Sequence, residues 1–169
     1  MATLIVGENT YVTLAEADEY FDSFLYSDYW TQSDEDTKIK ALITACDMLD
    51  NGFYWAGEKT DSDQLLEFPR TGEFGCGDTI DPNEVPKAIK NAQCLQAQYL
   101  IEYPDVLKPV SDVIKKEKLD VMEIEYFESN YRKQSWIYDI VKNRLRHCYG
   151  APKPQKSITE IYYGQCIRN

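Results

Sequence analysis

Residues 33–52 read SDEDTKIKALITACDMLDNG, and this stretch decides what kind of fold the chain can form. Its apolar side chains recur every three or four positions and therefore share one face of a helix: Ile39, Leu42, Ile43, Cys46 and Leu49. The acidic residues at 34–36 suit a first helical turn, because negative charge there offsets the helix dipole. Asn51-Gly52 is a typical end for a helix. The stretch therefore predicts an amphipathic helix that must bury one face against other elements.

Three more segments predict helices of the same kind. One begins at Thr13, because Thr13-Leu14-Ala15-Glu16 has the form of a capping box. Another begins at Pro86, which suits a first helical position, and ends before Pro104. The last spans residues 135–149, ahead of Gly150. The four segments together predict a mainly α fold, a small helical bundle of about four helices.

The remaining segments predict three other features. Residues 53–85 form a long aromatic-rich loop, which we expect its own aromatic side chains to pack onto the helices. Residues 113–127 predict a short β-hairpin, because apolar residues alternate with Glu123 and Glu125. We expect a helical domain over residues 1–150 and an extended C-terminal arm over residues 151–169.

Four residues of the long loop have a structural interpretation rather than a functional one. Trp55, Phe68 and Pro69 are of the type that packs a loop onto a helical core. Arg70 follows them directly, and we expect its guanidinium to pair with a carboxylate. We favour scaffold roles for all four over contacts with a partner.

Charge is unevenly distributed over the 169 residues. The net charge is −11, but residues 130–169 alone carry a net charge of +6. An acidic surface repels phosphate, which disfavours DNA binding over the whole molecule. Two interpretations of the basic segment stay open: it gives the molecule two electrically different ends, or it neutralises an acidic body.

The sequence shows no motif for bond-making chemistry. His147 is the only histidine, and consecutive helical residues point about 100° apart, so it does not face Cys148. No glycine-rich phosphate loop, zinc-ligand spacing or CxxC pair occurs. The odd count of five cysteines indicates free thiols in a reducing compartment. We therefore expect no enzyme activity, no catalytic residue, no metal and no cofactor, and we expect a soluble protein without a membrane partner.

Aromatic residues accompany the basic ones near the C-terminus: Tyr131, Trp136, Tyr138, Tyr149, Tyr162 and Tyr163. Such a mixture can stack on unpaired bases, but tyrosine and arginine also favour protein interfaces. Given the acidic body, we favour contact with proteins. The candidate partner-binding residues are Arg144, Arg146, Ile158, Ile161, Tyr162 and Tyr163.

An ordered series of short segments resembles one protein family. The series runs through YVTLAEADEYF at 11–21, ALITA at 41–45, WAG at 55–57, QLLEFPR at 64–70 and, before the predicted strand, KEK at 116–118. It is similar to the tailed-phage proteins labelled DnaT-like single-stranded-DNA-binding proteins, over about residues 3–127. Similar proteins act as head–tail connector, or adaptor, subunits.

The resemblance implies a virion structural protein at the head–tail junction, made in the host cytoplasm. Such subunits form a homo-oligomeric ring, commonly dodecameric, between the portal protein and the tail nozzle or tail tube. The ring lines the DNA exit channel and lets double-stranded DNA pass during genome ejection without specific binding. The alternative is a single-stranded-DNA-binding protein that uses Arg144 and Arg146, the function that the family label names.

Overall fold

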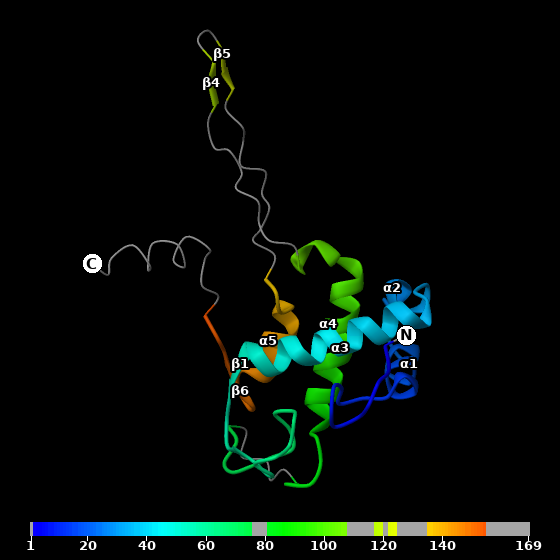
Figure 1. Ribbon diagram of the computed structural model, residues 1–169, viewed down its shortest axis with the longest axis vertical. Helices are drawn as coiled ribbons and strands as arrows, with labels where there is room; N and C mark the ends of the chain where they lie inside the picture. Colours follow the sequence, from blue (N-terminus) through cyan, green and yellow to red (C-terminus); the bar gives the residue numbers. More distant parts are fainter. Residues whose placement is uncertain (1, 76–80, 108–116, 120–121, 125–134, 155–169) are drawn as a thin grey trace, which may run out of the picture.

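The computed structural model describes residues 2–75, 81–107, 117–119, 122–124 and 135–154 (Figure 1). Helices dominate these residues, and the short strands form two-stranded antiparallel ribbons. The mainly α fold that the helical periodicity predicts is therefore confirmed.

The first helix, α1 (Leu14–Asp22), begins with the predicted capping box. The backbone N–H of Glu16 donates to Thr13 Oγ1 at 3.1 Å, and the Thr13 N–H donates to Glu16 Oε2 at 2.7 Å. Both groups would otherwise lack a partner at the start of the helix. The inward face of α1 buries Phe21.

A short second helix, α2 (Asp28–Thr31), follows α1 and was not predicted. It contains a single buried residue, Trp30, whose ring lies 4.8 Å from the ring of Phe21 between centroids. The indole Nε1–H donates to Asp18 Oδ1 at 2.8 Å. A segment of four residues is too short to show helical periodicity, which is why the sequence did not predict this helix. The burial of Trp30 attaches it to the rest of the domain.

The third helix, α3 (Glu35–Gly52), confirms the prediction made from residues 33–52. Asp34 caps it by accepting a hydrogen bond from the Thr37 N–H at 3.0 Å. Leu42, Cys46 and Leu49 of the predicted apolar stripe are fully buried. The chain leaves the helix at Gly52 and passes directly into a strand.

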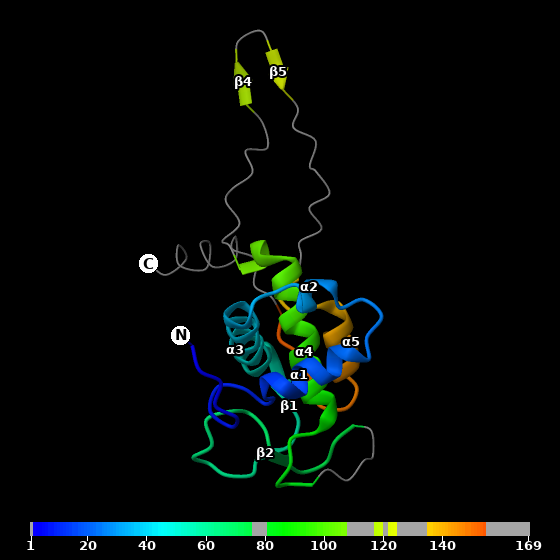
Figure 2. The same ribbon diagram turned by 90° about the vertical axis from the view of Figure 1, so that its right-hand side faces the viewer.

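The fourth helix, α4 (Lys87–Glu102), lies at the centre of the domain, with α3 on one side and the last helix on the other (Figure 2). Its position explains why two of its glutamines are fully buried. Gln93 donates to Thr10 Oγ1 at 2.8 Å and to the Leu42 carbonyl at 2.9 Å. A 3₁₀ turn, η1 (Pro104–Leu107), ends this part of the chain.

The described residues contain three antiparallel two-stranded ribbons. The first pairs β1 (Phe53–Trp55) with β6 (Gly150–Pro152), and the second pairs β2 (Glu58–Lys59) with β3 (Arg70–Thr71). The third pairs β4 (Glu117–Leu119) with β5 (Met122–Ile124), which confirms the predicted hairpin.

The ribbon of β1 and β6 was not predicted, and it spans the expected boundary between the domain and the arm. Residues 150–152 pair with β1 and thus form part of the helical domain's surface. The later part of the expected arm, residues 155–169, lies outside the described residues.

The last helix, α5 (Asp139–Leu145), is shorter than the predicted 135–149. Tyr138 has an extended backbone, with φ −53° and ψ 131°, because its N–H donates to the side chain of Gln96 at 2.8 Å rather than to a helical carbonyl. A tertiary hydrogen bond therefore delays the start of the helix, and no local sequence pattern reveals it.

The long loop packs through its aromatic side chains, as predicted. The rings of Phe53 and Trp55 stack 4.8 Å apart, and the Trp55 ring meets Phe68 edge-on at 4.9 Å. Arg70 Nη1 lies 2.6 Å from Glu67 Oε2, so the predicted pairing of Arg70 with a carboxylate is also confirmed. These contacts bury Phe68 and Arg70 against the core.

Two of the described cysteines confirm the expectation of free thiols and one contradicts it. Cys46 and Cys94 are free and buried, and burial raises the pKa of the Cys94 thiol to about 12. Cys148 forms a disulfide bond, so the expectation that all five cysteines are free thiols is wrong.

Candidate nucleic-acid interface

The segment from residue 135 to residue 154, which holds α5 and β6, carries the basic charge of the described residues. It contains Lys142, Arg144, Arg146 and Lys153 against a single acidic residue, Asp139. By contrast, residues 14–31, which hold α1 and α2, contain five acidic residues and no basic one. Among the described residues, the basic and the acidic charges are therefore concentrated in different elements: α5 and β6 for the former, α1 and α2 for the latter.

Hydrogen bonds from α4 fix the start of this basic segment. The buried side chain of Gln96 donates to the Trp136 carbonyl at 2.8 Å and accepts from the Tyr138 N–H at 2.8 Å. The Tyr99 ring stacks on the Tyr138 ring at 4.9 Å with an interplanar angle of 10°, and its hydroxyl donates to the Ser135 carbonyl at 3.1 Å. The residues before α5 are thus held in one conformation on the central helix.

The helix itself is anchored by Val141 and Leu145, which are fully buried. Because these two lie four residues apart on the inner face, Arg144 and Arg146 project from other faces of the last turn and beyond it, and both are exposed. Positive charge at this end of a helix also interacts favourably with the helix dipole. Arg144 and Arg146 directly precede and follow the buried Leu145, so they flank it on opposite sides at the end of α5, and both are solvent-accessible.

The basic side chains differ in how strongly the protein engages them. Lys142 Nζ donates to Ser135 Oγ and lies 3.4 Å from Asp139 Oδ1, so part of its charge is already compensated. In the part of the chain that the structure describes, no carboxylate lies within ion-pair distance of Arg144 or Arg146. The two arginines are therefore the better candidates for a phosphate.

Arg144 has one electrostatic neighbour on α1. Burial raises the pKa of the Tyr20 hydroxyl, and the nearby Arg144 guanidinium opposes part of that increase. Arg146 Nε donates to the ring nitrogen Nε2 of His147 at 3.1 Å, so His147 lies beside this arginine.

Exposed aromatic rings accompany the arginines. Trp136 lies three residues before Asp139, the first residue of α5, and it is 64% exposed. Tyr54 on β1 is 62% exposed, and Lys153 Nζ lies 5.4 Å from the centroid of its ring. Sequence reasoning included Trp136 among the aromatic residues of the basic segment but missed Tyr54, because its basic neighbour is almost one hundred residues away in the chain.

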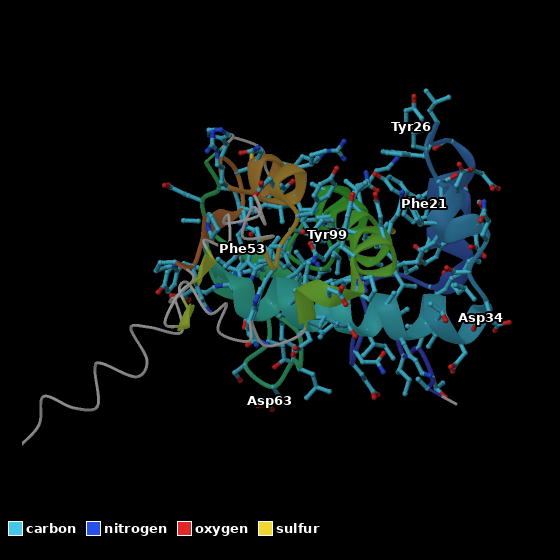
Figure 3. All side chains as sticks on the ribbon, turned by 90° about the horizontal axis from the view of Figure 1, so that it is seen from above. Phe21, Tyr26, Asp34, Phe53, Asp63 and Tyr99 are labelled. Atoms are coloured by element: carbon cyan, nitrogen blue, oxygen red, sulfur yellow. The ribbon has the colours of Figure 1, made fainter. Side chains whose placement is uncertain are left out.

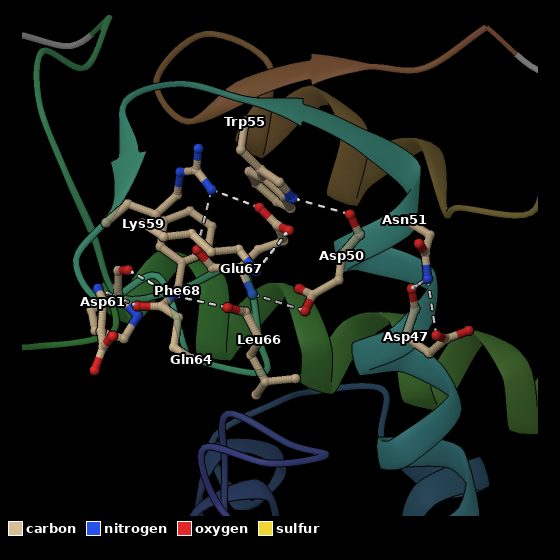
Figure 4. A network of polar contacts seen from close by, with 12 residues as sticks. Asp47, Asp50, Asn51, Trp55, Lys59, Asp61, Gln64, Leu66, Glu67 and Phe68 are labelled. Atoms are coloured by element: carbon tan, nitrogen blue, oxygen red, sulfur yellow. Dashed lines mark hydrogen bonds and ion pairs between the residues drawn. The ribbon is translucent and has the colours of Figure 1, made fainter.

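A second polar cluster, at the end of α3, has the opposite charge (Figure 4). Asp50 accepts hydrogen bonds from the Tyr11 hydroxyl and from the Glu67 N–H, the latter at 3.0 Å. A cavity of about 570 Å³ adjoins it, with carboxylates of Glu8, Asp47, Asp50 and Glu67 in its lining. Such a lining repels phosphate, so the basic surface is the better place for a nucleic acid.

The remaining predicted partner-binding residues cannot be placed on this surface. Ile158, Ile161, Tyr162 and Tyr163 lie outside the described residues. The candidate interface therefore consists of the two arginines and Trp136, with Tyr54 and Lys153 on the adjacent ribbon.

None of the described helices is both long enough and apolar enough to cross a membrane.

No curated protein matches the chain, and no solved structure matches it. The family model described as "Putative DnaT-like ssDNA binding protein" matches residues 2–161.

This match corrects the functional prediction made from the resemblance. The family description names binding of single-stranded DNA, so the prediction of a virion head–tail connector is wrong, and the predicted portal and tail partners and dodecameric ring are overturned with it. The expectation that DNA passes without specific binding is wrong for the same reason. The alternative interpretation, a single-stranded-DNA-binding protein, is the one that the match supports. Because the match covers almost the whole sequence, the chain belongs to the DnaT-like ssDNA-binding protein family.

Proposed function

We propose that this protein binds single-stranded DNA through Arg144, Arg146 and Trp136, which we call the α5 surface. The proposal is a binding role without bond-making chemistry. The observation that carries it is the presence, around one helix, of two exposed arginines that lack a carboxylate partner among the described residues and of an exposed indole three residues before that helix begins.

The charges of the α5 surface fit the backbone of a nucleic acid. Arginine presents a planar fork of donors that matches two phosphate oxygens, and each phosphate that it neutralises releases a condensed counterion. The acidic elements on the rest of the domain repel phosphate. A strand is therefore directed to one surface instead of coating the molecule.

The exposed indole fits the bases of a single strand. Base stacking on an aromatic side chain is worth about 1–3 kcal/mol per base and tolerates any sequence, because every base has a π-face. In a duplex the same faces are covered by neighbouring base pairs. Trp136 therefore favours unpaired DNA, and its backbone is already held by Gln96 before DNA arrives.

The test measures binding of a fluorescein-labelled 20-nucleotide oligothymidine by anisotropy over a series of salt concentrations. The wild type is expected to bind, and the double variant Arg144→Ala/Arg146→Ala is expected to bind more weakly. Its slope of log affinity against log salt should be shallower by about 1.4, because each lost phosphate contact removes about 0.7.

The matched control removes two lysines from other helices. Lys40 and Lys87 are exposed residues of α3 and α4, so Lys40→Ala/Lys87→Ala changes the net charge by the same amount. We expect this variant to keep the wild-type slope. Equal slopes for the two double variants, or no binding by the wild type at about 0.15 M salt, would contradict the proposal.

A further inference from the structure

The exposed ring of Tyr54 lies on the outer face of the ribbon formed by β1 and β6. Side chains alternate along a strand, so Phe53 and Trp55 point inward and stack on each other while Tyr54 points outward. The opposite residue in the ribbon is Ala151, whose side chain is a single methyl group. The residue directly across from Tyr54 therefore leaves its ring uncovered.

Hydrogen bonds before and after Tyr54 hold its backbone in the β1–β6 ribbon. The Ala56 N–H donates to the Tyr149 carbonyl, and the Lys153 N–H donates to the Gly52 carbonyl, each at 2.8 Å. The two strands also approach closely at Gly150, where a Cβ atom would lie 2.5 Å from the Tyr54 carbonyl oxygen. The ribbon therefore fixes the backbone from which the Tyr54 ring projects, so this part of the chain does not have to be ordered when a ligand binds.

Lys153 supplies a positive charge at the same ring. It follows Ala151 by two residues and thus shares the outer face with Tyr54, and its Nζ lies 5.4 Å from the ring centroid. Among the described residues no carboxylate lies within ion-pair distance of Lys153. The pair therefore offers an exposed π-surface and, over the same ring, an ammonium group that has no ion-pair partner among the described residues.

We propose that Tyr54 and Lys153 form a second subsite for single-stranded DNA, in which one unpaired base stacks on the ring and the ammonium group binds a neighbouring phosphate. This inference rests on the proposed function and extends it from α5 to the β1–β6 ribbon. The ligand is an unpaired nucleotide, because only a flipped or single-stranded base exposes a face to the ring.

The exposed pair has one other explanation, a cation–π contact that serves only the protein's own surface. The two explanations differ in what they predict for DNA. A contact that serves the protein alone leaves the affinity for DNA unchanged when the ring is removed, whereas a stacking subsite loses affinity in proportion to the lost base contact.

The experiment compares Tyr54→Ala and Tyr54→Phe in the full chain, with the same labelled oligothymidine. Tyr54→Ala is expected to weaken binding roughly five- to 150-fold, while Tyr54→Phe keeps most of the affinity because the ring remains. The matched control is Tyr26→Ala, which removes a tyrosine that is 77% exposed. Figure 3 shows Tyr26 far from Phe53, the neighbour of Tyr54.

A second probe separates the base contact from the phosphate contact. An abasic oligomer keeps the phosphates but lacks bases, so Tyr54→Ala and the wild type should bind it equally. Lys153→Ala should weaken binding to both oligomers and reduce the salt slope by about 0.7.

The outcomes distinguish the subsite from the function on which it rests. If the wild type binds and the arginine variant is weakened, but Tyr54→Ala behaves like Tyr26→Ala, then the subsite is wrong and the α5 surface stands. If the wild type does not bind oligothymidine, both proposals are overturned. If Tyr54→Ala weakens binding to the abasic oligomer equally, the stacking role is overturned.

Discussion

Asp50 is a carboxylate that the fold holds at an energetic cost when it is ionised. Burial raises the pKa of Asp50 from 3.8 to about 6, although the Tyr11 hydroxyl and the Glu67 N–H both donate to it. A carboxyl group whose pKa is higher in the folded state binds its proton more tightly there than in the unfolded chain. The stability that it provides is complete below about pH 4 and is lost as the pH rises through about 6.

We therefore expect the free energy of unfolding to fall by up to about 3 kcal/mol between pH 4 and pH 7 because of this one group. Glu16 acts in the opposite direction, since its hydrogen bonds with Lys90 and Thr13 lower its pKa to about 2 and its contribution is lost only below about pH 4.5. Urea denaturation from pH 5 to pH 8 isolates the effect of Asp50. Asp50→Asn should flatten this dependence, whereas the exposed neighbour variant Asp47→Asn should keep it; equal profiles would contradict the assignment.

Arg70 is the residue that most firmly attaches the long loop. Its Nε donates to the Ala56 carbonyl at 2.8 Å and its Nη2 to the Gly57 carbonyl at 2.6 Å, in addition to the ion pair with Glu67. Removing a buried charge leaves its partners without compensation, so Arg70→Ala should lower the free energy of unfolding by about 3 kcal/mol.

Two further variants serve as references for the loss of unfolding free energy in Arg70→Ala. Arg70→Lys should recover only part of the loss, because an ammonium group cannot reproduce the guanidinium fork. Lys40 forms an exposed ion pair with Asp36, so Lys40→Ala should cost less than about 0.5 kcal/mol in the same urea titration. A loss for Arg70→Ala as small as that of the control would show that the loop does not depend on this side chain.

At the scale of elements, the attachment of α5 depends on Gln96. Gln96→Leu keeps the volume but leaves the Trp136 carbonyl and the Tyr138 N–H without their partner. Each unsatisfied buried group costs about 1–3 kcal/mol, so α5 should open more readily than α3. Hydrogen exchange followed by mass spectrometry should show reduced protection confined to residues 135–146; uniform loss over all helices would contradict this account.

The elements also show how far the sequence carries a prediction. The capping box at Thr13 and the apolar stripe of residues 33–52 located α1 and α3, because both signals lie within a few residues of each other. The start of α5 and the β1–β6 ribbon were not predicted, because both depend on residues that are distant in the sequence. The start of α5 depends on a hydrogen bond with Gln96 of α4, and the ribbon forms only when residues 53–55 meet residues 150–152.

The candidate site divides in the same way. Arg144 and Arg146 were predicted from the charge of their own segment, and both are exposed on the expected helix. Tyr54 is a candidate binding residue only because Lys153, which directly follows β6, lies over its ring. Candidate residues that lie within one segment can therefore be predicted from the sequence, whereas a candidate site formed by two distant segments can be identified only from the fold.

At the scale of the whole molecule, we expect the acidic helices to restrain the affinity for DNA that we propose for the α5 surface. Tyr20 of α1 lies near Arg144, which places the carboxylate-rich helix α1 beside the α5 surface. Glu19→Gln removes one exposed negative charge from α1 and should raise the affinity for oligothymidine a few-fold at about 0.05 M salt. The gain should vanish near 0.5 M salt, where charges are screened over a few ångströms.

Asp63→Asn serves as the control, because it removes an equal charge from the long loop, on a different side of the domain from α5 (Figure 3). Anisotropy titrations at the two salt concentrations provide the comparison. An equal gain for both variants would indicate that net charge alone, rather than the position of the acidic helix, sets the affinity.

The pairing of β1 with β6 also determines how late in synthesis the ribbon can form. Because β1 ends at Trp55 and β6 begins at Gly150, the ribosome must add residues 56–149 before the second strand exists. At about 5–20 residues per second, this interval lasts on the order of 5–20 seconds. During that time the backbone N–H and C=O groups of β1 lack their ladder partners, so the nascent chain presents an unpaired strand edge until β6 has been made.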